Sequence, residues 1–218
     1  TLGTTGIITG TLASDASVSG PYPITVTVTD RSGAQTTQTF TLCGWWEYDE
    51  AVTVLSNLKV FKGVNDGSNF APKQTITRAE VAAIIYRIVT GDVADNQAGI
   101  YKDYAKFKDV AANHWAAGYI GYCANAELVK GYPDGTFKPS GKVTGYEVLA
   151  MILRAVGYDK NNEFSGADWA LHVAQTAQQL GVLDNVAKTT DLNAPASREL
   201  VAELLFQGIQ KAQVTYTP

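Results

Sequence analysis

The stretch TRAEVAAIIYRIV, residues 77–89, decides the fold of this chain. Its apolar residues recur at intervals of three and four, which is the stripe of an amphipathic helix. They are Val81, Ile84, Ile85, Ile88 and Val89. Thr77 and Glu80 have the spacing of a capping box, in which each side chain satisfies a free backbone N–H of the other. The sequence therefore predicts a long helix that begins near Thr77.

The same stripe returns twice further along the chain. A shift of 67 residues gives the second copy, and a shift of 120 residues gives the third. These copies are Val148, Met151, Ile152, Ala155 and Val156, and then Val201, Leu204, Leu205, Gly208 and Ile209. Thr144 and Ser197 precede them as helix caps. One stripe is too small to be buried alone, so three repeats are expected to share one core.

The N-terminal part of the chain has a different composition. Residues 1–44 contain twelve threonines and only three charged residues. Apolar and threonine residues alternate over 22–30 and again over 37–42, which is typical of half-buried strands joined by the turn at 30–33. A third short strand is expected at 6–11. This region is predicted to be a small β segment.

Composition excludes several classes of protein. The 218 residues carry 17 Lys and Arg against 21 Asp and Glu, and this net charge of −4 argues against a nucleic-acid partner. No apolar run approaches the roughly 20 residues of a membrane span, so no membrane insertion is expected. Because the sequence begins at Thr1 without a leader, we interpret it as a processed product or an excised piece.

Four motifs carry a resemblance to a known family. They are FKDV at 107–110, HWA at 114–116, GYPDGTFKP at 131–139 and TRAE at 77–80. Together they resemble the S-layer homology (SLH) module, with three units at 45–106, 107–158 and 159–218 and an insertion at 91–106. Residues 1–44 resemble part of a bacterial immunoglobulin-like (Ig-like) module.

This resemblance implies a mainly α fold, with three SLH repeats in a pseudo-threefold, three-pronged spindle behind a short N-terminal all-β Ig-like segment. It also implies a function, because SLH grooves bind secondary cell-wall polysaccharide, often pyruvylated, and so anchor secreted proteins to the bacterial cell surface. The alternative is a structural or adhesive surface module that binds no glycan. The resemblance also implies a second kind of partner, namely further copies of the chain that self-associate in a surface layer.

No enzyme is expected from this sequence. It contains no Ser/His/Asp set, no phosphate-binding loop and no His-rich or Cys-rich metal cluster. The prediction is therefore a binding module without cofactor or metal.

Arg78 and Arg198 are the leading candidates for ligand binding. Each falls at the first position of a long helix, where capping does not need a cation and the helix dipole slightly disfavours one. An arginine beside free N–H groups can hold a carboxylate through two hydrogen bonds. The alternative is a solvent-exposed arginine paired with a nearby aspartate. For both arginines, removal of the side chain is expected to leave the stability of the protein almost unchanged.

The other candidates are aromatic residues and turn residues. Trp46 and Trp115 each begin a unit, as core anchors or as surfaces for a sugar ring. Two Asp-Gly turns either hold their loops or present polar groups to a ligand. These turns are Asp66-Gly67 and Asp134-Gly135.

Two further positions produce expectations that a structure can test. Gly145 stands where the other two units have arginine, so the second unit is expected to contribute most weakly to binding. Cys123 lies on the apolar face of a short helix and is interpreted as a small core residue, with a disulfide to Cys43 as the alternative.

Overall fold

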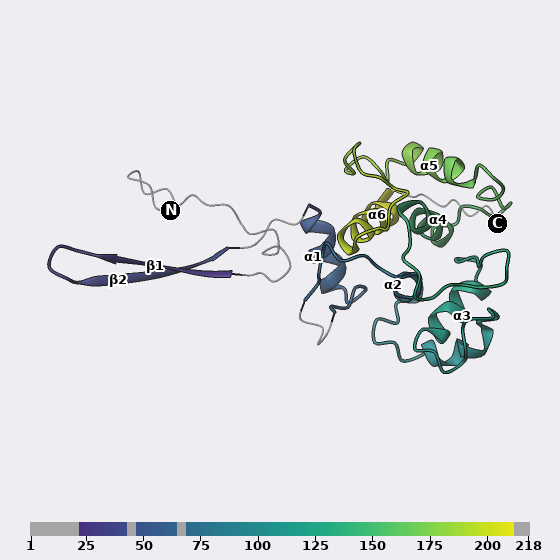
Figure 1. Cartoon of the computed structure of the whole chain (residues 1–218), viewed down its shortest axis with the longest axis horizontal. Helices are drawn as coiled ribbons and strands as arrows, with labels where there is room; N and C mark the ends of the chain where they lie inside the picture. The colour runs from purple at the N-terminus through teal and green to yellow at the C-terminus, as the bar shows by residue number, and fades with distance from the viewer. Residues whose placement is uncertain (1–21, 43–46, 65–68, 212–218) are drawn as a thin grey trace. The chain divides into compact units, whose positions relative to one another are not determined.

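A computed structural model describes residues 22–42, 47–64 and 69–211, and they fall into two bodies. The first body comprises residues 1–47 and 63–72, and it holds the described strands. The second comprises residues 48–62 and 73–218, and it holds the described helices (Figure 1).

The first body contains an antiparallel hairpin of β1 (Tyr22–Thr29) and β2 (Gln35–Leu42). The Asp30 carboxylate closes the turn by accepting the backbone N–H of Ser32 at 2.8 Å and of Ala34 at 2.9 Å. Both predicted strands and the turn between them are confirmed. The third strand, expected at 6–11, lies outside the described residues.

Short and long helices alternate along the second body. The short helices are α1 (Asp49–Asn57), α3 (Ala117–Asn125) and α5 (Trp169–Gln179), and the long helices are α2 (Arg78–Thr90), α4 (Gly145–Ala155) and α6 (Arg198–Lys211). The insertion folds into a 3₁₀ helix, η2 (Ala98–Tyr104), that packs on α3. The long helices begin where the caps predict.

The caps themselves also form as expected. The Thr77 hydroxyl accepts the N–H of Glu80 at 3.3 Å, and the Glu80 carboxylate accepts the N–H of Thr77 at 2.7 Å. Thr144 and Glu147 form the same capping box at the start of α4. At α6, Ser197 caps the helix through its hydroxyl but has no glutamate to close the box.

Three backbone hydrogen bonds form a closed ring immediately before the long helices. The N–H of Ile76 donates to Ala196 O at 3.2 Å, the N–H of Ala196 donates to Val143 O at 2.8 Å, and the N–H of Val143 donates to Ile76 O at 3.2 Å. Each repeat thus gives one hydrogen bond and receives one. All three side chains are buried, at 1% exposure or less. The ring is the local basis of the predicted pseudo-threefold arrangement.

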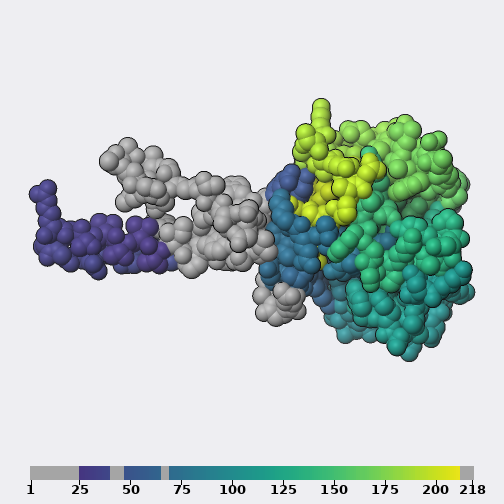
Figure 2. Space-filling view, in the orientation of Figure 1, coloured from purple at the N-terminus to yellow at the C-terminus, as the bar shows by residue number. Residues whose placement is uncertain are grey.

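Each prong of the helical body joins two different repeats. The long helix of one repeat packs against the short helix of the next, so that α2 packs with α3 and α4 packs with α5. The series closes because α6 packs against α1, and Figure 2 shows the yellow surface of α6 meeting the blue surface of α1. No repeat can bury its own stripe alone, so the three form one body.

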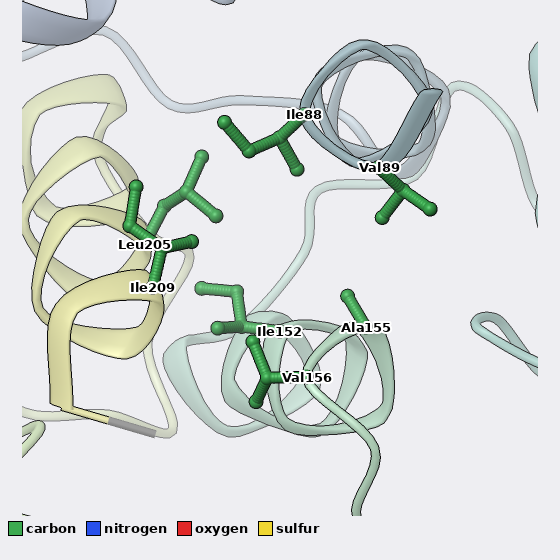
Figure 3. Close-up of a pocket in the computed structure, with 7 residues that line it drawn as sticks. All are labelled: Ile88, Val89, Ile152, Ala155, Val156, Leu205 and Ile209. Carbon is green, nitrogen blue, oxygen red and sulfur yellow. The ribbon is translucent and has the colours of Figure 1, made fainter. Parts of the chain in front are cut away.

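The long helices share one core, and it opens at their C-terminal ends. The stripes are buried near the ring, whereas Val89 is 40% exposed and Ile209 is 36% exposed. There the three helices surround an apolar pocket of about 210 Å³ (Figure 3). Its lining is Ile88, Val89, Ile152, Ala155, Val156, Leu205 and Ile209. The expectation of one shared core is confirmed, because all three stripes contribute to this lining.

Gly145 has a structural reason that the sequence did not reveal. A Cβ atom built on Gly145 would lie 2.7 Å from the Leu192 side chain and 3.1 Å from the Leu192 Cα. The Leu192 carbonyl also accepts the N–H of Tyr146 at 3.2 Å, which holds this chain segment against α4. Gly145 is therefore needed for close packing, and the weaker contribution of the second unit to binding stays a prediction.

We predict that Gly145→Ala destabilises the protein, although alanine favours helix more than glycine does. The clash with the Leu192 backbone should lower the free energy of unfolding by about 1–3 kcal/mol. Gly99→Ala is the control, because its Cβ would have no neighbour within 4 Å. Urea unfolding of both variants measures the difference. A Gly145→Ala variant as stable as the wild type would contradict the close-packing role.

Candidate functional site

Arg78 reaches from the start of α2 into the loop of the second repeat. Its side chain is only 4% exposed. Nε donates to Phe137 O at 2.8 Å, Nη2 donates to Lys130 O at 3.0 Å, and Nη1 donates to the Glu147 carboxylate at 2.9 Å. One N–H on each Nη remains without an acceptor in the described part of the chain. Arg78 therefore joins two repeats and keeps some donor capacity.

Aromatic rings enclose the Arg78 guanidinium. Its Cζ lies 4.8 Å from the centroids of both Tyr132 and Phe137. The Tyr132 hydroxyl donates to Glu147 at 2.8 Å, so the tyrosine and the arginine share one carboxylate. Burial raises the pKa of Tyr132, and the Glu147 carboxylate raises it further. Lys138 Nζ lies over the same tyrosine ring, 4.1 Å from its centroid.

The Asp134-Gly135 turn shapes the loop that carries these rings. The Asp134 carboxylate accepts the hydroxyl of Thr136 at 2.6 Å and its N–H at 3.0 Å, and these bonds lower the pKa of Asp134. Gly135 has a φ of +81°, a conformation that favours glycine. Lys108 Nζ donates to Asp134 O at 2.8 Å. Both turn residues have a structural role, and the exposed Asp134 lies close to Tyr132.

Arg198 occupies the matching place between the third repeat and the first. Its Nη2 donates to Lys62 O at 2.7 Å, and its Nη1 lies 3.9 Å from the Glu80 carboxylate. Lys62 and Glu80 correspond to Lys130 and Glu147 at the Arg78 site. Burial lowers the pKa of Arg198. The two predicted arginines are therefore equivalent and buried, and neither is the solvent-exposed side chain of the alternative hypothesis.

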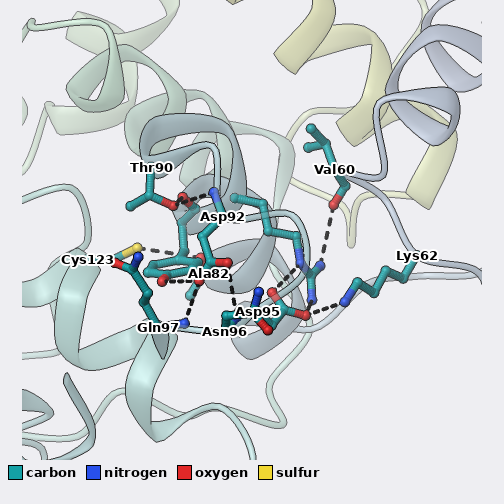
Figure 4. Close-up of polar contacts among 11 residues, drawn as sticks. Val60, Lys62, Ala82, Thr90, Asp92, Asp95, Asn96, Gln97 and Cys123 are labelled. Carbon is teal, nitrogen blue, oxygen red and sulfur yellow. Dashed lines mark hydrogen bonds and ion pairs between the residues drawn. The ribbon is translucent and has the colours of Figure 1, made fainter. Parts of the chain in front are cut away.

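A second polar cluster, which includes Lys62 and Asp95, lies near the end of α2 (Figure 4). Arg87 donates to both oxygens of Asp95, at 2.8 and 2.9 Å, and Lys62 pairs with the same carboxylate. Burial would raise the pKa of Asp95, but hydrogen bonds from Arg87 and Lys62 outweigh it and hold that pKa below its usual value. Lys62 thus links this cluster to Arg198, because the backbone carbonyl of Lys62 accepts a hydrogen bond from the Arg198 guanidinium.

A series of neighbouring side chains leads from Arg87 through Tyr119 to Trp115 on the surface. Arg87 lies 5.5 Å from the Tyr119 ring centroid, and the Tyr119 ring lies 6.1 Å from that of Trp115. Trp115 is 59% exposed, so it is no core anchor. Trp46, Asp66 and Gly67, the other predicted site residues, lie outside the described residues.

The lysine–aspartate pairing repeats in all three units, and the sequence analysis missed it. In the second repeat, Lys130 Nζ lies 3.0 Å and Arg154 Nε lies 2.6 Å from the Asp159 carboxylate. In the third, the charges are exchanged, because Asp184 pairs at 3.0 Å with Lys211. Each pair ties the loop after a short helix to the end of the long helix in the same repeat. The matching positions of Lys62 and Lys130 in the aligned repeats were the available signal.

Cys123 is buried and its thiol is free. Its Sγ contacts Ala82 O at 3.4 Å, and burial raises its pKa. The core role is confirmed, while Cys43 lies outside the described residues. Among the described residues there is no cluster of three or more potential metal ligands, and none of their helices is long and apolar enough to cross a membrane.

Comparison with known proteins agrees with these repeats. The family model of the S-layer homology domain matches residues 44–82 and 106–149, and that of the putative Ig domain matches residues 1–43. The boundaries of the three units stay a prediction. The third repeat lies outside the S-layer homology matches, yet the hydrogen-bonded ring and the α6–α1 contact place it with the others.

Relatives of this chain include three surface proteins. The "Middle cell wall protein" of Brevibacillus brevis is 30% identical over 75% of this chain and 15% of its own length. The "Cell surface protein" of Thermoanaerobacter kivui is 30% identical over 78% of this chain and 21% of its own. The "Cellulosome-anchoring protein" of Acetivibrio thermocellus is 42% identical over 40% and 19%. The chain therefore spans about a fifth or less of the length of these relatives.

We predict that Arg78→Ala lowers stability, contrary to the expectation from sequence. The change removes the cation that pairs with the partly buried Glu147 carboxylate and the donor to two backbone carbonyl groups, which should cost about 2–4 kcal/mol. Arg31→Ala, at the exposed hairpin turn, is the control. Equilibrium unfolding of both variants measures the cost. If Arg78→Ala unfolds like the wild type, the guanidinium does not hold the two repeats together.

A second prediction concerns how the free energy of unfolding falls at acid pH. The Asp159 carboxylate is fully buried, and its pKa is held low by hydrogen bonds from Phe164 N, Arg154 and Lys130, which outweigh burial. Its contribution is present above the unfolded pKa of about 3.9 and is lost as pH falls through the lower folded value. Asp159→Asn should therefore flatten the loss of stability between about pH 5 and pH 2. The exposed Asp168→Asn should keep the wild-type slope, and an equal slope in both variants would refute the role of Asp159.

Proposed function

We propose that this chain, which carries S-layer homology domains at residues 44–82 and 106–149, anchors a secreted protein at the bacterial cell surface by binding an anionic wall polysaccharide. The similarity to surface-layer and cell-wall proteins supports anchoring and an extracellular location. The same similarity supports a non-catalytic role. Pyruvate on the polymer is the finer part of this proposal.

One observation carries the proposal: the exposed Trp115 stands beside a series of charged groups that leads to the Arg198 guanidinium. A sugar needs an apolar surface for its ring and polar groups for its hydroxyls, and an anionic sugar also needs a cation. This site offers all three: the Trp115 ring is the apolar surface, the Asp95 carboxylate is the polar group for hydroxyls, and the Lys62 ammonium is the cation. They lie between two repeats, so the site exists only in the assembled body.

The Arg78 site offers the same chemistry in another form. The Arg78 guanidinium lies beside the Tyr132 ring and has two N–H groups without an acceptor in the described residues. Lys138 places a second cation over the same ring. The third equivalent position has Gly145, which leaves no guanidinium there. We therefore propose two binding sites, one at Arg198 and one at Arg78.

The test of the general proposal is sedimentation with wall sacculi of Brevibacillus brevis, the source of one of the relatives. Hydrofluoric acid strips phosphate-linked polymers from sacculi. We expect the chain to sediment with native sacculi and not with acid-treated ones. Equal binding to both preparations would favour the structural or adhesive alternative.

Trp115→Ala tests the site itself. Because Trp115 is 59% exposed, its removal should barely change the melting temperature, but the loss of a sugar-stacking surface should weaken binding about ten- to a hundredfold. Leu171→Ala is the matched control, since Leu171 is 55% exposed on α5, the short helix of the third repeat. Binding isotherms with native sacculi compare the two variants. Equal affinities would remove Trp115 from the site.

A further inference from the structure

Six aromatic rings on and around α2, α3 and η2 form one continuous series. Neighbouring ring centroids lie between 5.0 and 6.1 Å apart, so each ring is in contact with the next. The two end rings, Trp115 and Tyr104, are exposed, whereas Tyr86 in the middle is buried. The series therefore joins two points on the surface through the core. In order, the rings are Trp115, Tyr119, Tyr86, Tyr122, Tyr101 and Tyr104.

Packing between the helices does not require tyrosine at these positions. When the repeats are aligned, the place of Tyr86 on α2 is taken by Leu153 on α4. The place of Tyr119 on α3 is taken by Val173 on α5. Both aliphatic residues are fully buried. The same helix contact is thus filled without aromatic rings or hydroxyl groups in the next prong, and the tyrosines call for another explanation.

Two of the phenols lie beside carboxylates. The Tyr86 hydroxyl donates to the Asp92 carboxylate at 2.7 Å. Hydrogen bonds from Gln97 N and from the Tyr86 hydroxyl lower the pKa of Asp92, which is therefore ionised at neutral pH (Figure 4). Burial raises the pKa of Tyr119, and the Asp95 carboxylate beside it raises that pKa further. A phenol releases its proton when it loses an electron, so both tyrosines have a proton acceptor in place.

We propose that this series is an electron relay that repairs Trp115 after a diffusing radical has removed one electron from its indole. The oxidised indole loses its N–H proton to water. An electron then passes from Tyr119 to Trp115, which takes a proton back from water, while the Tyr119 proton moves to Asp95. This inference goes beyond wall binding and does not depend on it.

The second step moves the missing electron into the core. An electron from Tyr86 restores Tyr119, whose proton returns from Asp95, and the Tyr86 hydroxyl proton passes to Asp92. The net change is a repaired Trp115 and a neutral tyrosyl radical on the buried Tyr86 ring. The direction follows from general redox chemistry, because at neutral pH a phenol that can release its proton is oxidised more readily than an indole.

Trp169 provides an internal control. It occupies the position of Trp115 in the third repeat, at the start of α5, and it is less exposed than Trp115. Among the described residues, no tyrosine ring contacts it. The relay should therefore protect Trp115 and leave Trp169 unprotected.

The first test follows the electron directly. Azide radicals produced by pulse radiolysis oxidise tryptophan in preference to neutral tyrosine, and the two amino-acid radicals have distinct absorption bands. We expect the wild-type chain to show a fast conversion of tryptophan radical to tyrosine radical, with a rate that does not change with protein concentration. Trp115→Phe and Tyr119→Phe should both lose this phase. Tyr158→Phe, outside the series, should keep it.

The second test measures the damage that remains. After continuous exposure to azide radicals in air, peptide mass spectrometry gives the oxidised fraction of each tryptophan. In the wild type, Trp115 should be oxidised less than Trp169 despite its greater exposure. Tyr119→Phe should reverse that order without changing Trp169, and Tyr86→Phe should give an intermediate fraction at Trp115. Both variants keep the aromatic ring, and circular dichroism confirms that they are folded.

Either of two results would overturn the relay. One is a tryptophan radical that decays in the same way in the wild type and in Tyr119→Phe. The other is a Trp115 that is oxidised as heavily in the wild type as in Tyr119→Phe. Both results would leave the aromatic series with a packing role alone, and neither would affect the proposal of wall binding.

Discussion

The closed ring of backbone hydrogen bonds among Ile76, Val143 and Ala196 is the constraint on which the rest of the helical body depends. Each of the three segments is hydrogen-bonded to the other two, so no repeat can separate from the body without breaking two backbone hydrogen bonds. A buried backbone group without a partner is costly, and all three residues are buried. The ring therefore fixes the three segments relative to one another before any helix begins.

The position of the ring determines what the first helical residue can do. The caps follow the ring directly, and the next residue of each long helix points into the neighbouring repeat. In two repeats this residue is Arg78 or Arg198, which bonds the neighbour's backbone and faces its capping glutamate. In the other it is Gly145, against Leu192. Assembly and the proposed ligand binding thus use the same side chains, and the contacts between repeats explain why the two arginines are buried.

Much of this architecture could be predicted from the sequence, because its signals are local. The stripe from Val81 to Val89 and the Thr77–Glu80 spacing depend only on helix geometry, and both predictions were confirmed. The exchange of partners between repeats could not be predicted, since it depends on contacts such as α6 against α1 that join distant parts of the chain. The burial of Arg78 was missed and the role of Trp115 was left open between core and surface for the same reason: solvent exposure is a property of the assembled repeats.

The central claim is that ligand binds between repeats, at the guanidinium groups that hold them together. Its most direct test is a nitrogen-15 NMR titration of the chain with wall polymer released from Brevibacillus brevis sacculi. The account predicts shifts of the Arg78 and Arg198 Nε–H signals and of the Trp115 indole N–H, with the amides of Gly145 and Leu192 unchanged. Shifts confined to residues away from these three side chains, with the arginine signals unmoved, would contradict it.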